Sequence, residues 1–229
     1  GMRSMYGGDA AGQSVANTLQ ARSMSWAVAA RNAEDGISAA QTAESALLEI
    51  AALAQRLREV GIQADNEGLL VAASDLAALN AEATALGTAI DQIVSTTTFN
   101  GVSLLGTSAV STNIGVTDAG GTVALKTSDA IAAAARTEAT AADGSADETL
   151  TDVAISLGNI AAGIAALKGR QAVAYSASAN LAAAAARIED TDFASETANL
   201  TKNSVLNQSA MAMVAQANQA QSAVLAVLN

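Results

Sequence analysis

The chain contains no cysteine, no histidine and no proline among its 229 residues. Without cysteine there is no disulfide framework, and without both cysteine and histidine the usual zinc sites and the Cys–His and Ser–His–Asp nucleophiles are excluded. No glycine-rich phosphate loop ending in Lys-Ser or Lys-Thr is present. The absence of proline favours long helices, because proline inside a helix removes a hydrogen bond and clashes with the preceding turn. We predict no catalytic residue, no metal site and no cofactor.

An enzyme built on carboxylates, or on a serine–lysine pair, is the alternative that these absences leave open. The lysines are Lys126, Lys168 and Lys202, and most carboxylates fall on polar helix faces, where a solvated surface explains them. Asp190 and Asp192 form the closest acidic cluster, but they lie at a predicted helix break. Because the common parts of a catalytic site are missing, we predict that the protein is not an enzyme.

Aromatic residues make up only 2% of the chain, although 51% of its residues are hydrophobic. Most of the hydrophobic residues are alanine, so helices can approach closely while the buried layer stays thin. This composition favours a slender bundle over a round globule.

The formal net charge of −11 argues against a nucleic-acid partner and against an anionic membrane surface, since both need basic residues. We expect no membrane insertion, because no stretch looks long and apolar enough to span a bilayer. The N-terminus has no apolar signal-peptide core, so export would need another route.

Three stretches carry apolar residues spaced alternately three and four positions apart, which is typical of helices that wind around one another. We predict a mainly α fold: an elongated antiparallel rod of long coiled-coil-like helices, with a small β-hairpin region between its N- and C-terminal helical parts. The seams are Trp26, Ala29, Ala33, Gly36, Ala40, Ala43, Leu47, Ile50, Ala54, Leu57, Gly61 and Ala64; Leu76, Leu79, Ala83, Leu86, Ile90 and Ile93; and Leu150, Val153, Leu157, Ile160, Ile164, Leu167, Ala174, Leu181, Ala185 and Ile188.

Interruptions of this spacing place the ends of the elements. Ser74 is a plausible N-cap for the second helix. β-Branched residues alternate with polar ones around Asn-Gly and Gly-Gly pairs, and these predict the hairpin region. A polar, glycine-containing stretch predicts a linker before the third long helix. The predicted helices cover about 10–64, 74–97, 149–188 and 195–228, with the hairpin region at about 99–127, a short helix at 129–138 and the linker at 141–147.

The last helix is uncharged, because no side chain beyond Lys202 is ionisable. A helix on the surface of its own domain normally carries charge opposite its apolar face. We therefore predict that this helix is buried among copies of itself; a terminal helix docked on its own domain is the alternative. The predicted polymerisation seam is Leu206, Ala210, Met213, Ala217, Ala220, Val224 and Val227.

Five short motifs follow one another along the chain: Asp9–Gly12, Arg31–Ser38 with Gln41–Glu44, Thr98–Leu105, Arg187–Glu196 and Ala215–Gln219. In this order, and at the ends of the predicted helices, they resemble the motifs of bacterial flagellins, the subunits of the flagellar filament. The likeness covers most of the chain.

The resemblance implies a division into domains. Residues 10–194 would form the rod domain called D1 in this family, and residues 195–229 the C-terminal helix of D0, the domain in which the two chain termini pair along the filament's inner channel. Residues 1–9 are expected to be an irregular start, with Gly1 before Met2 the remnant of an expression tag. The N-terminal D0 helix would precede Tyr6 and is expected to be missing through trimming or a misplaced gene start.

The resemblance also implies a structural subunit that self-assembles into a helical tube for motility outside the cell, exported without a cleaved signal peptide. Its partners would be copies of itself, hook-associated and cap proteins, and an export chaperone at the C-terminal helix. The alternatives are a hook–filament junction protein and a surface adhesin or polysaccharide-binding homologue. A binding module of the last kind would need aromatic platforms, and only one Trp, two Tyr and two Phe are available.

Many flagellins are bound by an innate immune receptor through the first rod helix and its neighbour. The possible contact residues here are Gln55, Arg56, Val60 and Glu82. The Arg and Glu positions match the family's pattern, whereas Val60-Gly61 departs from its usual Glu-Leu-Ala continuation. Alternatively, Arg56 and Arg58 stabilise a filament by pairing with Glu59 or with a neighbouring subunit.

Without an N-terminal partner for its last helix, the chain alone is expected to stay soluble and not to polymerise. Electron microscopy of the purified chain tests this expectation, and straight filaments would contradict it.

Overall fold

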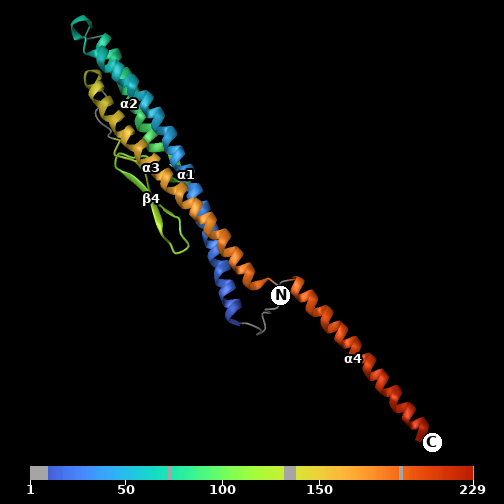
Figure 1. Ribbon diagram of the computed structural model, residues 1–229. Helices are drawn as coiled ribbons and strands as arrows, with labels where there is room; N and C mark the ends of the chain where they lie inside the picture. Colours follow the sequence, from blue (N-terminus) through green and yellow to red (C-terminus); the bar gives the residue numbers. More distant parts are fainter. Residues whose placement is uncertain (1–9, 72–73, 132–137, 191–192, 229) are drawn as a thin grey trace. The chain divides into compact units, whose positions relative to one another are not determined.

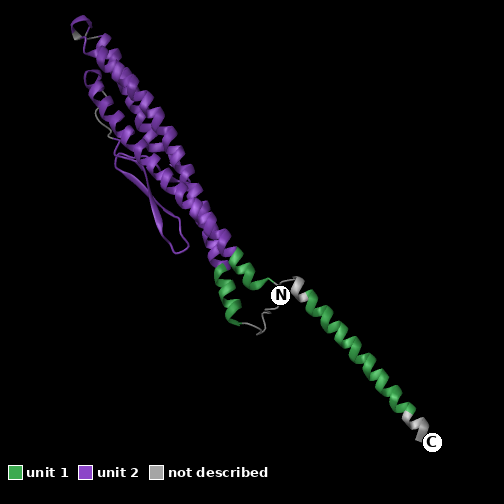
Figure 2. Ribbon diagram, in the orientation of Figure 1, with its two compact units in different colours: residues 1–19, 183–229 green, residues 20–182 purple. Residues whose placement is uncertain are grey.

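The computed structural model describes residues 10–71, 74–131, 138–190 and 193–228, with the side chains of 67, 193–196 and 224–228 left out. The backbone divides into two compact units (Figure 2). Residues 20–182 form the rod unit, and residues 1–19 with 183–229 form the terminal unit. The predicted short helix at 129–138 lies mostly outside the described residues, and Asp129 to Ile131 are not helical.

Three long helices run side by side in the rod unit (Figure 1). Helix α1 spans Ala10–Ala64, α2 spans Asp75–Thr96 and α3 spans Ala142–Glu189. A short 3₁₀ turn, η1 (Glu67–Leu69), lies between α1 and α2. Both α2 and α3 are antiparallel to α1, because the first turns of both lie beside its last turns. The predicted mainly α fold of long antiparallel helices is confirmed.

The heptad seams form the core of the rod unit. Every member of the α1 seam is buried except Trp26, which is half-buried. Leu47 and Ile50 of α1 pack in one cluster with Ile90 of α2 and with Ile160 and Leu167 of α3. Burying one such side chain stabilises a fold by about 1.5–3 kcal/mol. The association of the three helices therefore follows from the spacing of these residues.

Glycines mark the points of closest approach. A Cβ placed on Gly61 of α1 would lie 2.3 Å from the backbone nitrogen of Asp143 at the start of α3. A Cβ on Gly163 of α3 would lie 2.7 Å from Leu125 Cδ1, and one on Gly36 of α1 would lie 3.0 Å from Leu167 Cδ1. These elements can pack this closely only because glycine has no side chain at the points of contact.

Two separate hairpins occupy the predicted β region. Strands β1 (Thr98–Phe99) and β2 (Val102–Ser103) form one antiparallel pair, and β3 (Val110–Gly115) and β4 (Thr122–Ser128) form the other. The larger hairpin lies along α1: Asn32 Nδ2 donates to the Gly115 carbonyl at 3.1 Å, and Arg22 Nε donates to Asp118 Oδ2 at 2.7 Å. The second hairpin is thereby fixed to the helices by polar contacts as well as by apolar packing.

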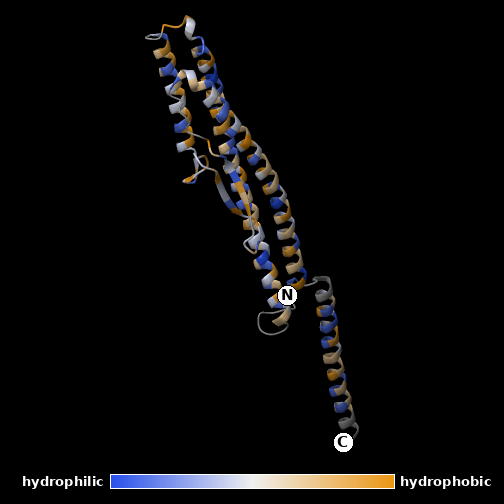
Figure 3. Ribbon diagram, turned by 90° about the vertical axis from the view of Figure 1, so that its left-hand side faces the viewer, coloured by the Kyte–Doolittle hydropathy of each residue, from blue (hydrophilic) through white to orange (hydrophobic). Residues whose placement is uncertain are grey.

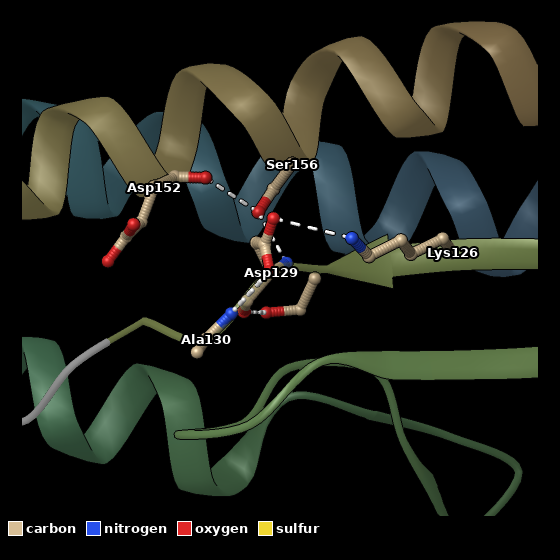
Figure 4. Close-up of polar contacts among 6 residues, drawn as sticks. Lys126, Asp129, Ala130, Asp152 and Ser156 are labelled. Atoms are coloured by element: carbon tan, nitrogen blue, oxygen red, sulfur yellow. Dashed lines mark hydrogen bonds and ion pairs between the residues drawn. The ribbon is translucent and has the colours of Figure 1, made fainter.

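The chain that follows β4 is tied to α3 through Ser156, a fully buried serine (Figure 4). Its Oγ accepts the backbone N–H of Asp129 at 2.8 Å and donates to the carbonyl of Asp152 at 2.7 Å. The side chain of Asp129 in turn pairs with Lys126 Nζ at 3.3 Å. The Ser156 hydroxyl thus provides a hydrogen-bond acceptor for the Asp129 N–H, which lies just beyond the end of β4.

The predicted linker at 141–147 is wrong, because a short 3₁₀ turn, η2 (Ala139–Ala141), leads directly into α3 at Ala142. Ala142 and Ala146 are fully buried beside Leu57 of α1, and Asp143 stands in the first turn, where the helix dipole favours a carboxylate. Packing of the two alanines outweighs the low helix propensity of Gly144, which costs about 1 kcal/mol.

The expectation that no stretch could span a bilayer is also wrong on length and composition alone. The segment Ala139–Glu189 contains an 18-residue window of mean hydropathy 1.6, which reaches the apolarity of a membrane span. Its seam residues Val153, Ile160 and Leu167 are buried among α1 side chains. Only 28% of the window is buried in the structure, so packing on α1 covers part of its apolar surface.

Ser74 occupies the N-cap position of α2, as predicted, but its side chain makes no capping hydrogen bond. Its hydroxyl donates instead to Asp75 Oδ1 at 2.9 Å, and the backbone N–H of Val71 donates to Asp75 Oδ2 at 3.0 Å. Two hydrogen bonds lower the pKa of Asp75 below its ordinary value. The larger effect comes from the Val71 N–H and the smaller from the Ser74 hydroxyl. The carboxylate therefore organises the turn that enters α2.

The lowered pKa of Asp75 predicts how this turn responds to acid. A carboxylate with a lowered pKa stabilises the fold above its unfolded-state pKa, and this contribution is lost as the pH falls through its folded-state pKa. An NMR titration of the side-chain carboxyl should give a midpoint below that of an exposed aspartate. Asp75→Asn is the control, and unfolding of this variant should depend less on pH in that acidic window. An ordinary titration midpoint for Asp75 would contradict the assignment.

The close contact at Gly61 predicts opposite effects for two glycine replacements. Gly61→Ala should destabilise the protein by about 1–3 kcal/mol, because the new methyl group overlaps the backbone of Asp143. Gly169→Ala in α3 is the matched control: an added Cβ there meets no atom within 4 Å, so this variant should be about 0.5–1 kcal/mol more stable. Urea unfolding followed by circular dichroism measures both, and equal effects would refute this account of the packing.

Candidate assembly surfaces

Helix α4 (Phe193–Leu228) leaves all of its described side chains exposed, from residue 197 to residue 223. Within the predicted seam, Leu206 is 56% exposed and Met213 is 74% exposed. Ala210, Ala217 and Ala220 are exposed as well, whereas the side chains of Val224 and Val227 lie outside the described residues. The structure thus places the described part of the seam on an uncovered helix face.

A second group of large apolar side chains on α4 was missed by the sequence analysis. At 100° per residue, Met211 lies about 140° and Val214 about 80° around the axis from Leu206. Together with Leu200 they form a second apolar line, and the colouring of Figure 3 shows apolar and polar residues interspersed along this helix. The heptad spacing of the predicted seam follows one line, and Asn203 and Asn207 interrupt the other. The missed exposed residues are Leu200, Val205, Met211 and Val214.

The absence of charge sets the chemistry of this surface. Since no ionisable side chain follows Lys202, the rest of α4 can be buried without removing a charge from water. Asn and Gln side chains between the apolar lines can donate and accept hydrogen bonds with a neighbouring helix. Such a surface is suited to burial against other helices.

The predicted receptor-contact residues lie near the end of α1 and on the facing side of α2. Arg56 donates to Glu82 through Nη2 at 2.7 Å and through Nε at 2.9 Å, and its Nη1 donates to Glu59 at 2.8 Å. The hydrogen bonds that Arg56 donates to Glu59 and to Glu82 raise the pKa of its guanidinium above the ordinary value. Gln55 is exposed beside this group. The structure therefore joins Arg56 and Glu82 in one exposed charge cluster.

Val60 does not belong to that exposed surface. Its side chain is 1% exposed and packs with Leu57 and Ala64 of α1 and Leu79 of α2. The inclusion of Val60 among accessible contact residues is therefore wrong, because seam packing holds it inside. The neighbouring Gly61 is required by the contact with Asp143.

Arg58, the other arginine of this segment, points toward a different helix. Its Nε donates to Asp147 Oδ1 of α3 at 2.8 Å. The two arginines thus link α1 to both of its partner helices. Both ion pairs are about half exposed, so each contributes only about 0–1 kcal/mol.

The rod unit also holds a recess of about 400 Å³ between α1 and the two hairpins. Its walls include Gly36 of α1, Phe99 and Asn100 of the first hairpin, and Ile114 of the second, with Asp35 at the same site. Across the described part of the chain, no cluster of three or more acidic side chains could hold a metal ion.

Comparison with known proteins gives two family matches. The model for the bacterial flagellin N-terminal helical region matches residues 7–112, and the model for the bacterial flagellin C-terminal helical region matches residues 144–228. These two regions contain the α1–α2 pair with the first hairpin, and α3 with α4.

Several curated relatives match almost the whole chain. A flagellin of Halalkalibacterium halodurans is 36% identical over 97% of this chain and 85% of its own length, and a flagellin of Bacillus subtilis is 32% identical over 97% and 87%. The flagellar filament 33 kDa core protein of Treponema phagedenis is 31% identical over 97% and 86%. A crystal structure of Bacillus cereus flagellin has 25% identity and a TM-score of 0.44, covering 75% of this chain and 94% of that one.

Proposed function

The chain belongs to the bacterial flagellin family and is a structural subunit of the flagellar filament, and we propose that its copies join through the two apolar lines of α4. One observation carries this proposal: every described side chain of α4 is exposed, including large apolar ones, and none beyond Lys202 is ionisable. An apolar surface of this kind gains free energy when a neighbouring chain covers it.

Two lines on different sides of the helix allow each copy to contact more than one neighbour. When the contacting surfaces of two copies differ and the contact does not close into a ring, repetition generates a helical assembly. Each contact can be weak, because a copy held at several points dissociates only when all of them break. We infer that the strength of the filament comes from such repetition.

The same reasoning supports the division of the chain into a rod domain, residues 10–194, and a D0-like helix, residues 195–229. The rod would supply side-by-side contacts outside the helical tube of α4 segments. An uncovered α4 would also need protection before assembly, which supports an export chaperone as its partner. Hook-associated and cap proteins at the filament ends, and secretion without a cleaved signal peptide, complete the proposal.

Replacing Leu206 by glutamate tests the assembly seam. A charge buried in a contact between helices costs several kcal/mol, so Leu206→Glu should abolish or greatly shorten the filaments of the bacterium that makes this protein. Gln208→Glu is the matched control, because it adds the same charge on nearly the opposite side of α4. Electron microscopy of the cells counts the filaments, and circular dichroism checks folding. Normal filaments with Leu206→Glu, or equal loss in both variants, would contradict the proposal.

We propose a second role, contact with an innate immune receptor, through Gln55, Arg56 and Glu82. The supporting observation is that Arg56 and Glu82 remain 51% and 41% exposed while they fix one another's position. A preformed, exposed charge pair costs little side-chain entropy when a partner binds it. With Val60 buried, the contact would be mainly polar.

A receptor-reporter assay on the purified protein separates this role from a purely structural one. Arg56→Ala should lower the signal, because it removes the exposed guanidinium. Arg58→Ala, which breaks only the pair with Asp147 on α3, should leave the signal close to that of the unmodified protein. Both variants should remain folded, since each loses an exposed pair worth about 0–1 kcal/mol. An unchanged response to Arg56→Ala would exclude this contact.

A further inference from the structure

Asn100 and Gly101 form the two-residue turn that joins β1 to β2. They are also the one Asn-Gly pair in the sequence. Both residues are exposed, and both have positive φ, 50° for Asn100 and 79° for Gly101. Hairpin turns favour this pair because asparagine and glycine tolerate the left-handed conformation. The pair also places a side-chain amide next to a backbone nitrogen that no side chain shields.

We propose that Asn100 is a site of spontaneous deamidation, with water as the only co-reactant. After losing its proton to solvent base, the backbone nitrogen of Gly101 attacks Cγ of Asn100. A carbon–nitrogen bond forms, the side-chain nitrogen leaves as ammonia after taking up a proton, and a five-membered cyclic imide remains. Water then opens one of the two carbon–nitrogen bonds of the imide. The products are aspartate or isoaspartate, and nothing is oxidised or reduced.

The surroundings leave both reacting groups open. Among the described residues, no hydrogen bond or ion pair engages the side chain of Asn100. A Cβ placed on Gly101 would meet no atom within 4 Å, so solvent base can reach the nitrogen. By contrast, the amide of Asn32 donates to Gly115, and that of Asn80 accepts from the backbone of Ala139.

Most other asparagines are protected by secondary structure. Asn32, Asn80 and Asn203 lie within helices, where the following backbone N–H is held in the helical hydrogen-bond ladder. Asn66 lies outside the helices and is exposed, but the residue that follows it in the sequence is Glu67 and not glycine. Asn66 therefore serves as an internal comparison for an asparagine followed by a larger residue than glycine. Asn203 serves as one for an asparagine within a helix.

Opening of the hairpin formed by β1 and β2 limits the rate of deamidation at Asn100. Closing the imide ring requires the backbone of Asn100 to rotate out of its left-handed turn, so the hairpin must open locally. Two residue pairs, Thr98 with Ser103 and Phe99 with Val102, hold the sheet, and the Leu104 N–H closes it by donating to Thr97 at 3.0 Å. Such a small sheet opens at low cost compared with global unfolding. The reaction therefore proceeds in the folded protein, more slowly than in the unfolded chain.

Deamidation would change the recess that Asn100 borders. A carboxylate at this position would stand at the same recess as Asp35 and add to its negative charge. Isoaspartate would also lengthen the backbone of the turn by one carbon, so two residues could no longer join Phe99 and Val102 in their present register. Aspartate keeps the backbone intact and tolerates the left-handed conformation. The two products therefore differ in their effect on the hairpin.

Ageing the intact purified protein at neutral and at mildly alkaline pH, followed by peptide mass spectrometry, tests the proposal. The peptide with Asn100 should gain the mass of an amide-to-acid change several-fold faster than the peptides with Asn66 or Asn203, and faster at the higher pH. Isoaspartate and aspartate should both appear, together with free ammonia. The same measurement in denaturant should give a higher rate at Asn100, which reports the protection by the turn.

Two variants complete the test. Asn100→Gln should not convert, since its longer side chain does not form the five-membered ring, and Asn100→Asp reproduces the charge without lengthening the backbone. The isoaspartate fraction should unfold at a lower temperature than Asn100→Asp. The proposal is overturned if Asn100 stays unmodified while Asn66 or Asn203 converts, or if Asn100 yields aspartate without isoaspartate, because direct hydrolysis would then replace the imide.

Discussion

The close approach of helices along the small-residue seam of α1 is the constraint on which the rod unit depends. Alanine and glycine at the contact let the backbone of α3 come within 2.3 Å of where a Cβ on Gly61 would stand. At such distances a few Leu and Ile side chains, centred on Leu47 and Ile50, fill the space between three helices. The second hairpin then rests on the same helices, through Ile114 beside Gly36 and Leu125 beside Gly163. A composition with 2% aromatics can hold a stable fold because little interior volume has to be filled.

Apolar side chains are buried in the rod unit but exposed on helix α4 of the terminal unit. The rod unit buries its seams internally and keeps its ion pairs, such as Arg56 with Glu82, on the outside. Helix α4 leaves its apolar lines uncovered and carries no charge beyond Lys202. The proposed contact between copies through α4 rests on this contrast. The net charge of −11 lies entirely outside α4, because Glu196 and Lys202 cancel within this helix.

The sequence predicted well the elements whose evidence is a long repeat. The seam residues from Ala29 to Ala64 lie in the core because a heptad pattern over many turns admits one orientation of the helix. Local signals placed some features correctly, such as the turn at Asn100-Gly101 and the N-cap position of Ser74. They did not predict the bonding at the cap, where the Ser74 hydroxyl donates to Asp75.

Other errors arose where tertiary contacts outweighed local composition. The composition of residues 141–147 is typical of a linker, but Ala142 and Ala146 pack in one cluster with Leu57 and hold this segment in α3. Val60 was included because it lies in the stretch that matches the family's receptor contact, yet it is on the buried side of α1. The second apolar line of α4 was not predicted, because asparagines interrupt it and a single heptad register does not include it. Exposure of a given face can be read only from the packed structure.

Methionine oxidation gives the most direct test of the claim that α4 is covered only on assembly. Met211 and Met213, on different sides of the helix, are 65% and 74% exposed in the single chain. Limited oxidation of the dissociated protein should therefore convert both at the rate of a methionine in a short peptide. In filaments isolated from the bacterium, both should be strongly protected. Equal oxidation of the two methionines in free chains and in filaments would contradict the account.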